Sequence, residues 1–240
     1  MDRRRLLLAG AVAAVFLLFH GTASWLGSDR GQAGLWVGLI VVLATAAAQR
    51  LLYRTPLQDI PAALGLGRPT ALGIVVALLV SAALVAAVPA FALATGTRFS
   101  PFPGWVALLP GLFAQAGIAE ETLFRGFLFG RLREGRSFWR AAFLSTVPFL
   151  AVHLLLFASM SWPVALAAIL LAATVSFPLA HLYELGGGTV WAPAWMHFVI
   201  QGALKVAVAS GPSASLLPLV WMAAAATIPF LVFLVRRPAT

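Results

Sequence analysis

The sequence predicts an all-α membrane protein, a polytopic bundle of about eight transmembrane helices. Hydrophobic residues make up 62% of the 240 residues and charged residues only 10%, whereas a soluble domain carries roughly 25% charged residues. The mean hydropathy of the chain is +0.98. The apolar residues also gather in runs close to the ~20 residues that a helix needs to cross the hydrocarbon core.

Eight such runs follow one another along the chain. Their predicted boundaries are 6–26, 34–52, 70–96, 105–131, 138–159, 163–184, 189–209 and 213–235. Residues 53–69 are too polar and too rich in proline and glycine to cross, so we expect a connection at the membrane interface. Residues 97–104 predict a loop on the opposite side, and Gly186, Gly187 and Gly188 predict a turn.

The first run has an alternative interpretation as a secretory signal peptide. Three arginines precede it, residues 6–19 have the length of a signal-peptide core, and Thr22, Ala23 and Ser24 form a cluster of small residues. The apolar run continues to Leu26, however. That length favours a retained membrane helix.

The basic residues predict the orientation of the bundle. With the N-terminus in the cytoplasm, eight spans place Arg30 and Arg98 outside and twelve arginines inside. The inside set is Arg3, Arg4, Arg5, Arg50, Arg54, Arg68, Arg131, Arg133, Arg136, Arg140, Arg236 and Arg237. This asymmetry follows the positive-inside rule and predicts that both termini are cytoplasmic.

Composition also excludes several classes of function. The net charge of +9 does not indicate a nucleic-acid partner, because the arginines lie at the ends of apolar runs and form no single basic patch. The expected surroundings are instead the lipid bilayer. The chain has no cysteine, which excludes disulfides, a thiolate nucleophile and a cysteine metal site.

Two adjacent glutamates lie inside the fourth apolar run. Of the seven acidic residues, only Glu120 and Glu121 fall within a long apolar stretch, where a carboxylate is costly and faces the bundle interior or a polar cavity. Arg125 is placed to pair with Glu121 one helical turn away. Adjacent helical residues point about 100° apart, so Glu120 should point elsewhere, toward a cavity. The alternative is a buried ionic lock between helices.

Histidines in the fifth and seventh runs are the other candidates for chemistry. A lone histidine on an apolar helix is usually a core residue, which we expect for His20 and His181. His153 and His197 lie in runs that are otherwise almost free of charge. Gln201 follows His197 by one turn, so imidazole and amide share a helix face.

Prolines precede both of these histidines, Pro148 before His153 and Pro193 before His197. A proline inside a helix frees a backbone carbonyl and bends the helix, which is tolerated beside a polar cavity. Pro178 also precedes His181, so this feature alone does not separate the catalytic candidates from the core histidine.

The order of these motifs on successive runs resembles the CPBP family of intramembrane proteases, the CAAX-processing and bacteriocin-processing group also called Abi. The motifs are Glu120-Glu121-x-x-x-Arg125, Phe149-x-x-x-His153 and His197-x-x-x-Gln201. The resemblance covers about residues 105–205, including Leu-Gly-Gly-Gly-Thr-Val-Trp-Ala-Pro before His197. The family usually has Asn, sometimes Asp, where this chain has Gln201. The amide donor is kept but reaches about one methylene further.

The resemblance implies hydrolysis of a peptide bond inside the membrane. It implies Glu120 as general base, His153 as the residue that helps to activate a water, and His197 and Gln201 as donors to the oxyanion. Glu121 and Arg125 would hold the geometry, and Phe124 and Phe149 would contact the substrate. The implied division is 1–104 for N-terminal helices and the interfacial connection, 105–209 for the catalytic core, and 210–240 for a last helix with a basic tail.

A metal-dependent mechanism is the competing interpretation of the same residues. Glu120, His153 and His197 could bind zinc through three ligands and leave one position for water. No His-Glu-x-x-His lies on one helix, so the sequence requires no cofactor, and we favour the metal-free mechanism.

Two other functional classes compete with the protease. The first is a catalytically silent membrane scaffold or immunity-type protein of the same fold, favoured by Gln201 and opposed by the intact Glu120, His153 and His197. The second is a proton-coupled transporter, which the absence of an internal repeat disfavours. The expected partner is a protein or peptide substrate, with or without a prenyl group, and the expected location is the bacterial plasma membrane. Lys205, near the outer end of its span, is expected to reach the interface rather than a substrate carboxylate.

Overall fold

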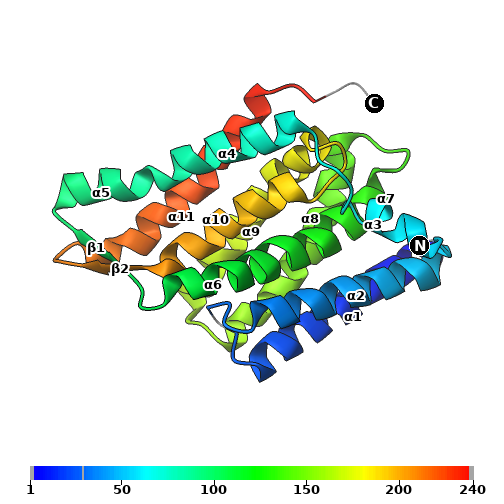
Figure 1. Cartoon of the computed structure of the whole chain (residues 1–240), viewed down its shortest axis with the longest axis horizontal. Helices are drawn as coiled ribbons and strands as arrows, with labels where there is room; N and C mark the ends of the chain where they lie inside the picture. The colour runs from blue at the N-terminus through cyan, green and yellow to red at the C-terminus, as the bar shows by residue number, and fades with distance from the viewer. Residues whose placement is uncertain (1–2, 29, 238–240) are drawn as a thin grey trace.

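The computed structural model describes residues 3–28 and 30–237, without the side chains of residues 3–5. The first and last residues of the chain, to which the prediction of cytoplasmic termini refers, lie outside this range. The described part is mostly helical. Figure 1 shows α1 and α2 along one edge of the bundle, α4 and α5 along the opposite edge, and the remaining long helices between them.

The described helices agree with the predicted apolar runs. The α-helices are α1 Arg3–Trp25, α2 Gly34–Tyr53, α3 Ile60–Ala63, α4 Ala71–Val85, α5 Ala87–Thr95, α6 Trp105–Leu112, α7 Gly130–Arg133, α8 Phe138–His153, α9 Trp162–Leu185, α10 Trp191–Val206 and α11 Leu217–Thr227. The 3₁₀ segments are Leu57–Asp59, Leu154–Ala158, Ala214–Leu216 and Ile228–Leu234. Two π-helical segments, Phe113–Ala119 and Thr122–Phe129, connect α6 to α7.

Six helical stretches of the described chain are long and apolar enough to cross a membrane. They are Leu6–Trp25, Gly34–Tyr53, Ala71–Thr95, Phe138–Ala158, Trp162–Leu185 and Ala214–Leu234. These correspond to six of the eight predicted runs. The fourth and seventh runs are helical too, but neither is among the six. The count of eight spans stays a prediction.

Two short strands correct the all-α prediction. β1 Arg98–Pro101 and β2 Ala207–Ser210 form an antiparallel pair in which Arg98 faces Ser210. The seventh run was expected to be helical as far as 209, but α10 ends at Val206 because the backbone of Ala207 is already extended. Residues 98–101, predicted as loop, supply the hydrogen-bonding partner that makes this extension favourable.

The third run is also divided, into α4 and α5. Pro89 has no N–H to donate to the carbonyl of Val85, the residue at which α4 ends. Among the other prolines, Pro148 and Pro178 lie inside α8 and α9, which continue through them. Pro193 lies in the first turn of α10, where a missing N–H costs little, so the prediction that it bends the helix is wrong.

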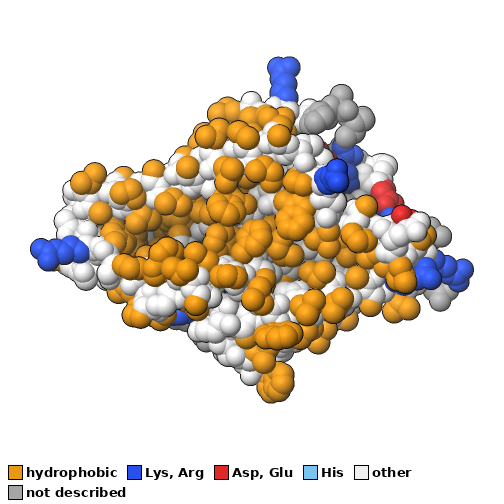
Figure 2. Space-filling view, in the orientation of Figure 1, with side chains coloured by type: hydrophobic (Ala, Val, Ile, Leu, Met, Phe, Trp, Pro, Cys, Tyr) orange, Lys and Arg blue, Asp and Glu red, His pale blue; other side chains and the backbone are white. Residues whose placement is uncertain are grey.

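Basic residues separate to the two ends of the bundle. At one end Glu184 of α9 binds both Arg133 and Arg237, the latter at 2.8 Å. At the other end the guanidinium of Arg30 donates to the carbonyl of Lys205 at 2.8 Å. Figure 2 shows a largely apolar face with the basic side chains mostly at its margins. Arg133 and Arg237, predicted inside, thus lie at the opposite end from Arg30, predicted outside, and which end is cytoplasmic stays a prediction.

Candidate active site

The two glutamates lie where one π-helical segment ends and the next begins. Glu120 and Glu121 separate Phe113–Ala119 from Thr122–Phe129, in one helical stretch that runs from α6 to α7. Short π-helical turns occur frequently at functional sites. Gly117, three residues before Glu120, lets the segment approach α10 closely: a Cβ at Gly117 would lie 2.8 Å from the carbonyl oxygen of Ala194.

The expected ion pair between Glu121 and Arg125 is confirmed. Arg125 Nη1 lies 3.0 Å from Glu121 Oε1, and both side chains are buried, with 2% and 0% of their residues' surface exposed. The guanidinium also lies over the ring of Phe149, 4.6 Å from its centroid. A buried ion pair needs such additional contacts, because its mutual attraction barely offsets the loss of water.

Two residues that sequence reasoning missed complete the surroundings of Arg125. Ser176 of α9 accepts a hydrogen bond from Arg125 Nη2 at 3.4 Å, and the hydroxyl of Thr146 of α8 donates to Ser176 Oγ at 2.9 Å. Their only signal in the sequence is a small polar side chain inside an apolar run. Glu121 and Arg125 are therefore connected to two further helices through hydroxyl groups.

His197 lies between the two glutamates. Its Nδ1–H donates to Glu121 Oε1 at 2.7 Å, and its Nε2 lies 3.7 Å from Glu120 Oε2. Glu120 therefore points away from Arg125, as expected, and it reaches the opposite nitrogen of the histidine that Glu121 binds. The two nitrogens lie on different sides of the imidazole ring, so two carboxylates that diverge on their own helix still reach one histidine on α10.

Gln201 joins the same cluster, as its position one turn after His197 predicts. Its side-chain nitrogen lies 2.8 Å from His197 Nε2 and 3.3 Å from Glu120 Oε1. An amide NH₂ has two hydrogens, so it can donate to both acceptors. When Nδ1 carries the proton shared with Glu121, Nε2 of the neutral ring is the acceptor.

His153 lies at the end of α8 and is half-buried. Its Nδ1–H donates to the carbonyl of Phe149 at 2.7 Å, which leaves Nε2 with a lone pair in the neutral ring. The side chain interacts electrostatically with Glu120, His197 and Arg125. The structure thus brings all three motifs together, although no hydrogen bond joins His153 to Glu120 in the described residues.

Phe124 and Phe149 pack together next to the cluster of Glu120, Glu121, His197 and Gln201. Their rings meet edge to face with centroids 4.7 Å apart, and only 1% of each residue is exposed. Phe149 also packs against the ring of His153 at 4.6 Å. Contact with a substrate stays a prediction for these two residues, while their packing against each other and the packing of Phe149 against Arg125 are observed.

A metal finds no ready ligand set here. Within residues 3–28 and 30–237, no group of three or more His, Asp or Glu side chains is arranged to hold a metal ion. Glu120, His153 and His197 are close, but His197 uses both nitrogens in contacts with Glu121 and Gln201. Zinc binding therefore stays a prediction. Among the described residues, the three side chains do not form a ligand set for it.

The two remaining histidines lie away from the cluster. His181 is buried, with Nε2 2.9 Å from the carbonyl oxygen of Val235 and its ring against Phe233, as expected of a core residue. His20 is exposed on α1 and only lies near the ring of Phe16. The expectation of a core position is wrong for His20, because its face of α1 points out of the bundle.

Comparison with known proteins supports the resemblance. No curated protein matches the chain. A family model described as "Type II CAAX prenyl endopeptidase Rce1-like" matches residues 101–203. This range contains Glu120, Glu121, Arg125, both clustered histidines and Gln201. Members of this family are generally peptidases, and together with the six apolar helices the match identifies an integral membrane protein. Residues 101–203 therefore match the family model of the Rce1-like type II CAAX prenyl endopeptidases, within the group that the three motifs resemble.

Proposed function

We propose that this protein is an intramembrane endopeptidase that hydrolyses a peptide bond of a protein substrate, in the manner of a CAAX prenyl protease. The observation that carries the proposal is His197 held between Glu120 and Glu121, with the amide of Gln201 beside it. Glu120 lies on the order of 20 Å along its helical stretch from both Trp105 and Arg133. Ionisable groups at such depth are expensive and are kept for function.

Glu120 is the proposed general base. Its carboxylate takes a proton from a water molecule while the water oxygen attacks the carbonyl carbon of the peptide bond, and the carbonyl electron pair moves to oxygen. His153 assists, because its Nδ1–H is occupied by the Phe149 carbonyl and its Nε2 lone pair can accept a hydrogen bond from the same water. Glu120 keeps 8% of its surface exposed, whereas Glu121 is fully buried, which favours Glu120 for contact with water.

His197 and Gln201 are the proposed oxyanion donors. When both ring nitrogens carry a proton, Nδ1–H donates to Glu121 and Nε2–H lies on the side of Gln201. In that state the 2.8 Å contact between the Gln201 nitrogen and Nε2 has to open, because two N–H donors cannot bond to each other, and both groups are then left to donate to the oxyanion. Losing one donor of this kind typically costs about 10²–10³ in rate.

Collapse of the tetrahedral intermediate completes the reaction. The carbonyl re-forms, the C–N bond breaks, and the proton held by Glu120 passes to the leaving amine. The products are a new carboxyl terminus and a peptide with a free amine. Glu121 and Arg125 act as positioning residues, since they orient His197 and touch no reacting atom.

The substrate is proposed to be a protein segment that enters the bilayer, with a prenylated C-terminus as the first candidate. The test uses full-length protein in detergent with a quenched peptide library, part of it farnesylated. Wild type is compared with Glu120→Gln and His197→Ala, each with and without a strong chelator. Cleavage that is lost in both variants and survives the chelator supports the proposal. Cleavage that a chelator abolishes and zinc restores would replace it with the metal-dependent mechanism.

A further inference from the structure

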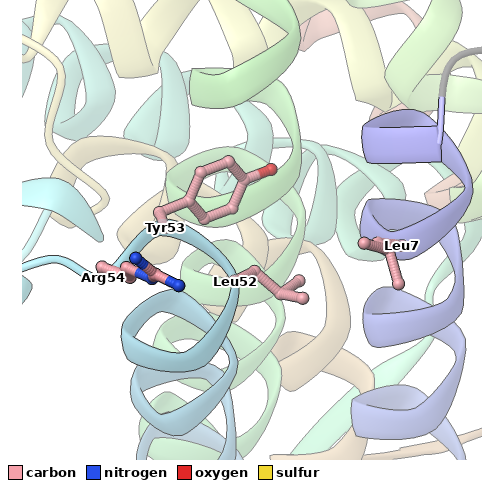
Figure 3. A pocket seen from close by; sticks show the side chains of 4 residues that line it. All are labelled: Leu7, Leu52, Tyr53 and Arg54. Atoms are coloured by element: carbon pink, nitrogen blue, oxygen red, sulfur yellow. The ribbon is translucent and has the colours of Figure 1, made fainter.

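A second site lies at one end of the bundle, apart from the glutamates. A cavity of about 350 Å³ opens between the start of α1 and the end of α2. Leu7 lines it from α1, Leu52 and Tyr53 line it from the last turn of α2, and Arg54 lines it from the position just after that helix. Figure 3 shows Leu52 directed toward Leu7 across the space, with Tyr53 and Arg54 at the end of α2. Apolar side chains and a cation therefore share one opening on the surface of the bundle.

The length of α2 places this cavity at the boundary of the bilayer. Helix α2 has 20 residues from Gly34 to Tyr53. At about 1.5 Å per residue it spans roughly 30 Å, the thickness of the hydrocarbon core. Tyr53 and Arg54 thus lie at headgroup level, where tyrosine and arginine are favoured, and Leu52 lies on the hydrocarbon side.

The charges around the cavity are positive. The guanidinium of Arg54 is exposed, and within the described chain it makes no ion pair with a carboxylate. Arg50, one turn earlier, donates to the carbonyls of Arg54 and Thr55. Arg131 lies over the ring of Tyr53, 4.1 Å from its centroid, and is already paired with Glu134. Arg54 is therefore the cation that a ligand can use.

The backbone of Arg54 gives a second, independent indication. It has φ 55° and ψ 27°, the left-handed conformation, and it is the one residue other than glycine with positive φ in residues 3–28 and 30–237. A helix usually ends in this conformation with glycine or asparagine. A bulky residue held there costs energy and suggests that its side chain serves a function.

We propose that this cavity binds one anionic phospholipid, with the phosphate at Arg54 and an acyl chain against Leu7 and Leu52. The phosphate of the lipid would meet Arg54 at headgroup level. The acyl chain would meet Leu7 and Leu52 on the hydrocarbon side. A soluble phosphate would satisfy Arg54 alone and leave the apolar part of the cavity unfilled. The proposal does not depend on the catalytic function.

The test measures lipid binding to delipidated full-length protein in detergent by native mass spectrometry. Phosphatidylglycerol is compared with phosphatidylcholine of the same acyl chains. Wild type should prefer phosphatidylglycerol, and Arg54→Gln should weaken its binding roughly fivefold, which corresponds to about 1 kcal/mol for one arginine at an anionic membrane surface. Leu7→Trp, which fills the cavity without changing charge, should lower the binding of both lipids.

Arg98→Gln is the matched control, because Arg98 is an exposed arginine of β1 at the other end of the bundle. It should leave phosphatidylglycerol binding unchanged. An equal loss in Arg98→Gln would overturn the proposal, since the effect would then be one of total charge. Equal affinity for the two lipids in wild type, or displacement of the lipid by millimolar inorganic phosphate, would also overturn it.

Discussion

Glu121 Oε1 and His197 Nδ1 lie 2.7 Å apart, and the same carboxylate oxygen lies 3.0 Å from Arg125 Nη1. One buried oxygen thus connects the ion pair of its own helix to the histidine of α10. This relationship makes Glu121 a positioning residue for His197 and a counter-ion for Arg125 at the same time. Its substitution should therefore affect both the stability and the rate.

Loss of the counter-ion should destabilise the protein strongly. Glu121→Gln leaves the buried charge of Arg125 uncompensated, and breaking a buried pair in this way typically costs about 3–5 kcal/mol. The double variant Glu121→Gln/Arg125→Met should recover part of that loss, because no unpaired charge remains. Thermal unfolding in detergent measures both. The control is Glu134→Gln, since the exposed pair of Glu134 and Arg131 should contribute at most about 1 kcal/mol.

Ser176 should support the rate through Arg125. Ser176→Ala removes the acceptor of Arg125 Nη2 and the partner of Thr146, which should cost about 1 kcal/mol of stability. We also expect a lower kcat at unchanged KM, and recovery of kcat in Ser176→Thr. Thr174→Ala is the control, because the Thr174 hydroxyl bonds only to the carbonyl of Leu170 in its own helix. A kcat equal to that of wild type in Ser176→Ala would remove Ser176 from the positioning network.

The rate should depend more on the amide group of Gln201 than on the length of its side chain. Gln201→Leu keeps a similar volume but removes both donors, and kcat should fall by about 10²–10³. Gln201→Asn keeps the donors on a shorter side chain and should stay within about tenfold of wild type. Steady-state kinetics on one cleaved peptide separates the two variants. If Gln201→Leu were as active as wild type, Gln201 would have no part in oxyanion stabilisation.

Gly117 approaches α10 closely, so a larger residue at this position should lower the rate by displacing the catalytic groups without changing their chemistry. In Gly117→Ala the new Cβ would lie 2.8 Å from the carbonyl oxygen of Ala194, so the two backbones must separate. A displacement of about 1 Å at reacting groups costs on the order of 10² in rate. Gly10→Ala is the control, since its new Cβ would have no atom within 4 Å apart from its chain neighbours and the backbone of its own helix. Equal kcat for the two variants would contradict this role of Gly117.

Sequence reasoning succeeded where an interaction depends on helical spacing. The pair of Glu121 and Arg125 and the shared face of His197 and Gln201 both follow from a separation of four residues. The six candidate spans likewise follow from the length of apolar runs. Such features depend on neighbours in the chain, and the sequence contains them directly.

The rest depends on contacts between distant segments. Convergence of Glu120 and Glu121 on one histidine requires the position of α10, which Gly117 and Ala194 determine across 77 positions of sequence. Ser176 and Thr146 look like ordinary small polar residues until α8 and α9 are packed against Arg125. The strand pair could not be foreseen either, because residues 98–101 and 207–210 each lack a strand pattern and extend only against each other.

The central claim is that Glu120 activates a water molecule for attack on a peptide bond. The most direct measurement is mass spectrometry of a farnesylated CAAX-type peptide incubated in H₂¹⁸O with full-length wild type or Glu120→Gln, both shown to be folded by thermal unfolding. The account predicts one ¹⁸O in the new carboxyl terminus formed by wild type and no product from Glu120→Gln. Product formation by Glu120→Gln at the rate of wild type would contradict the assignment of Glu120 as the base.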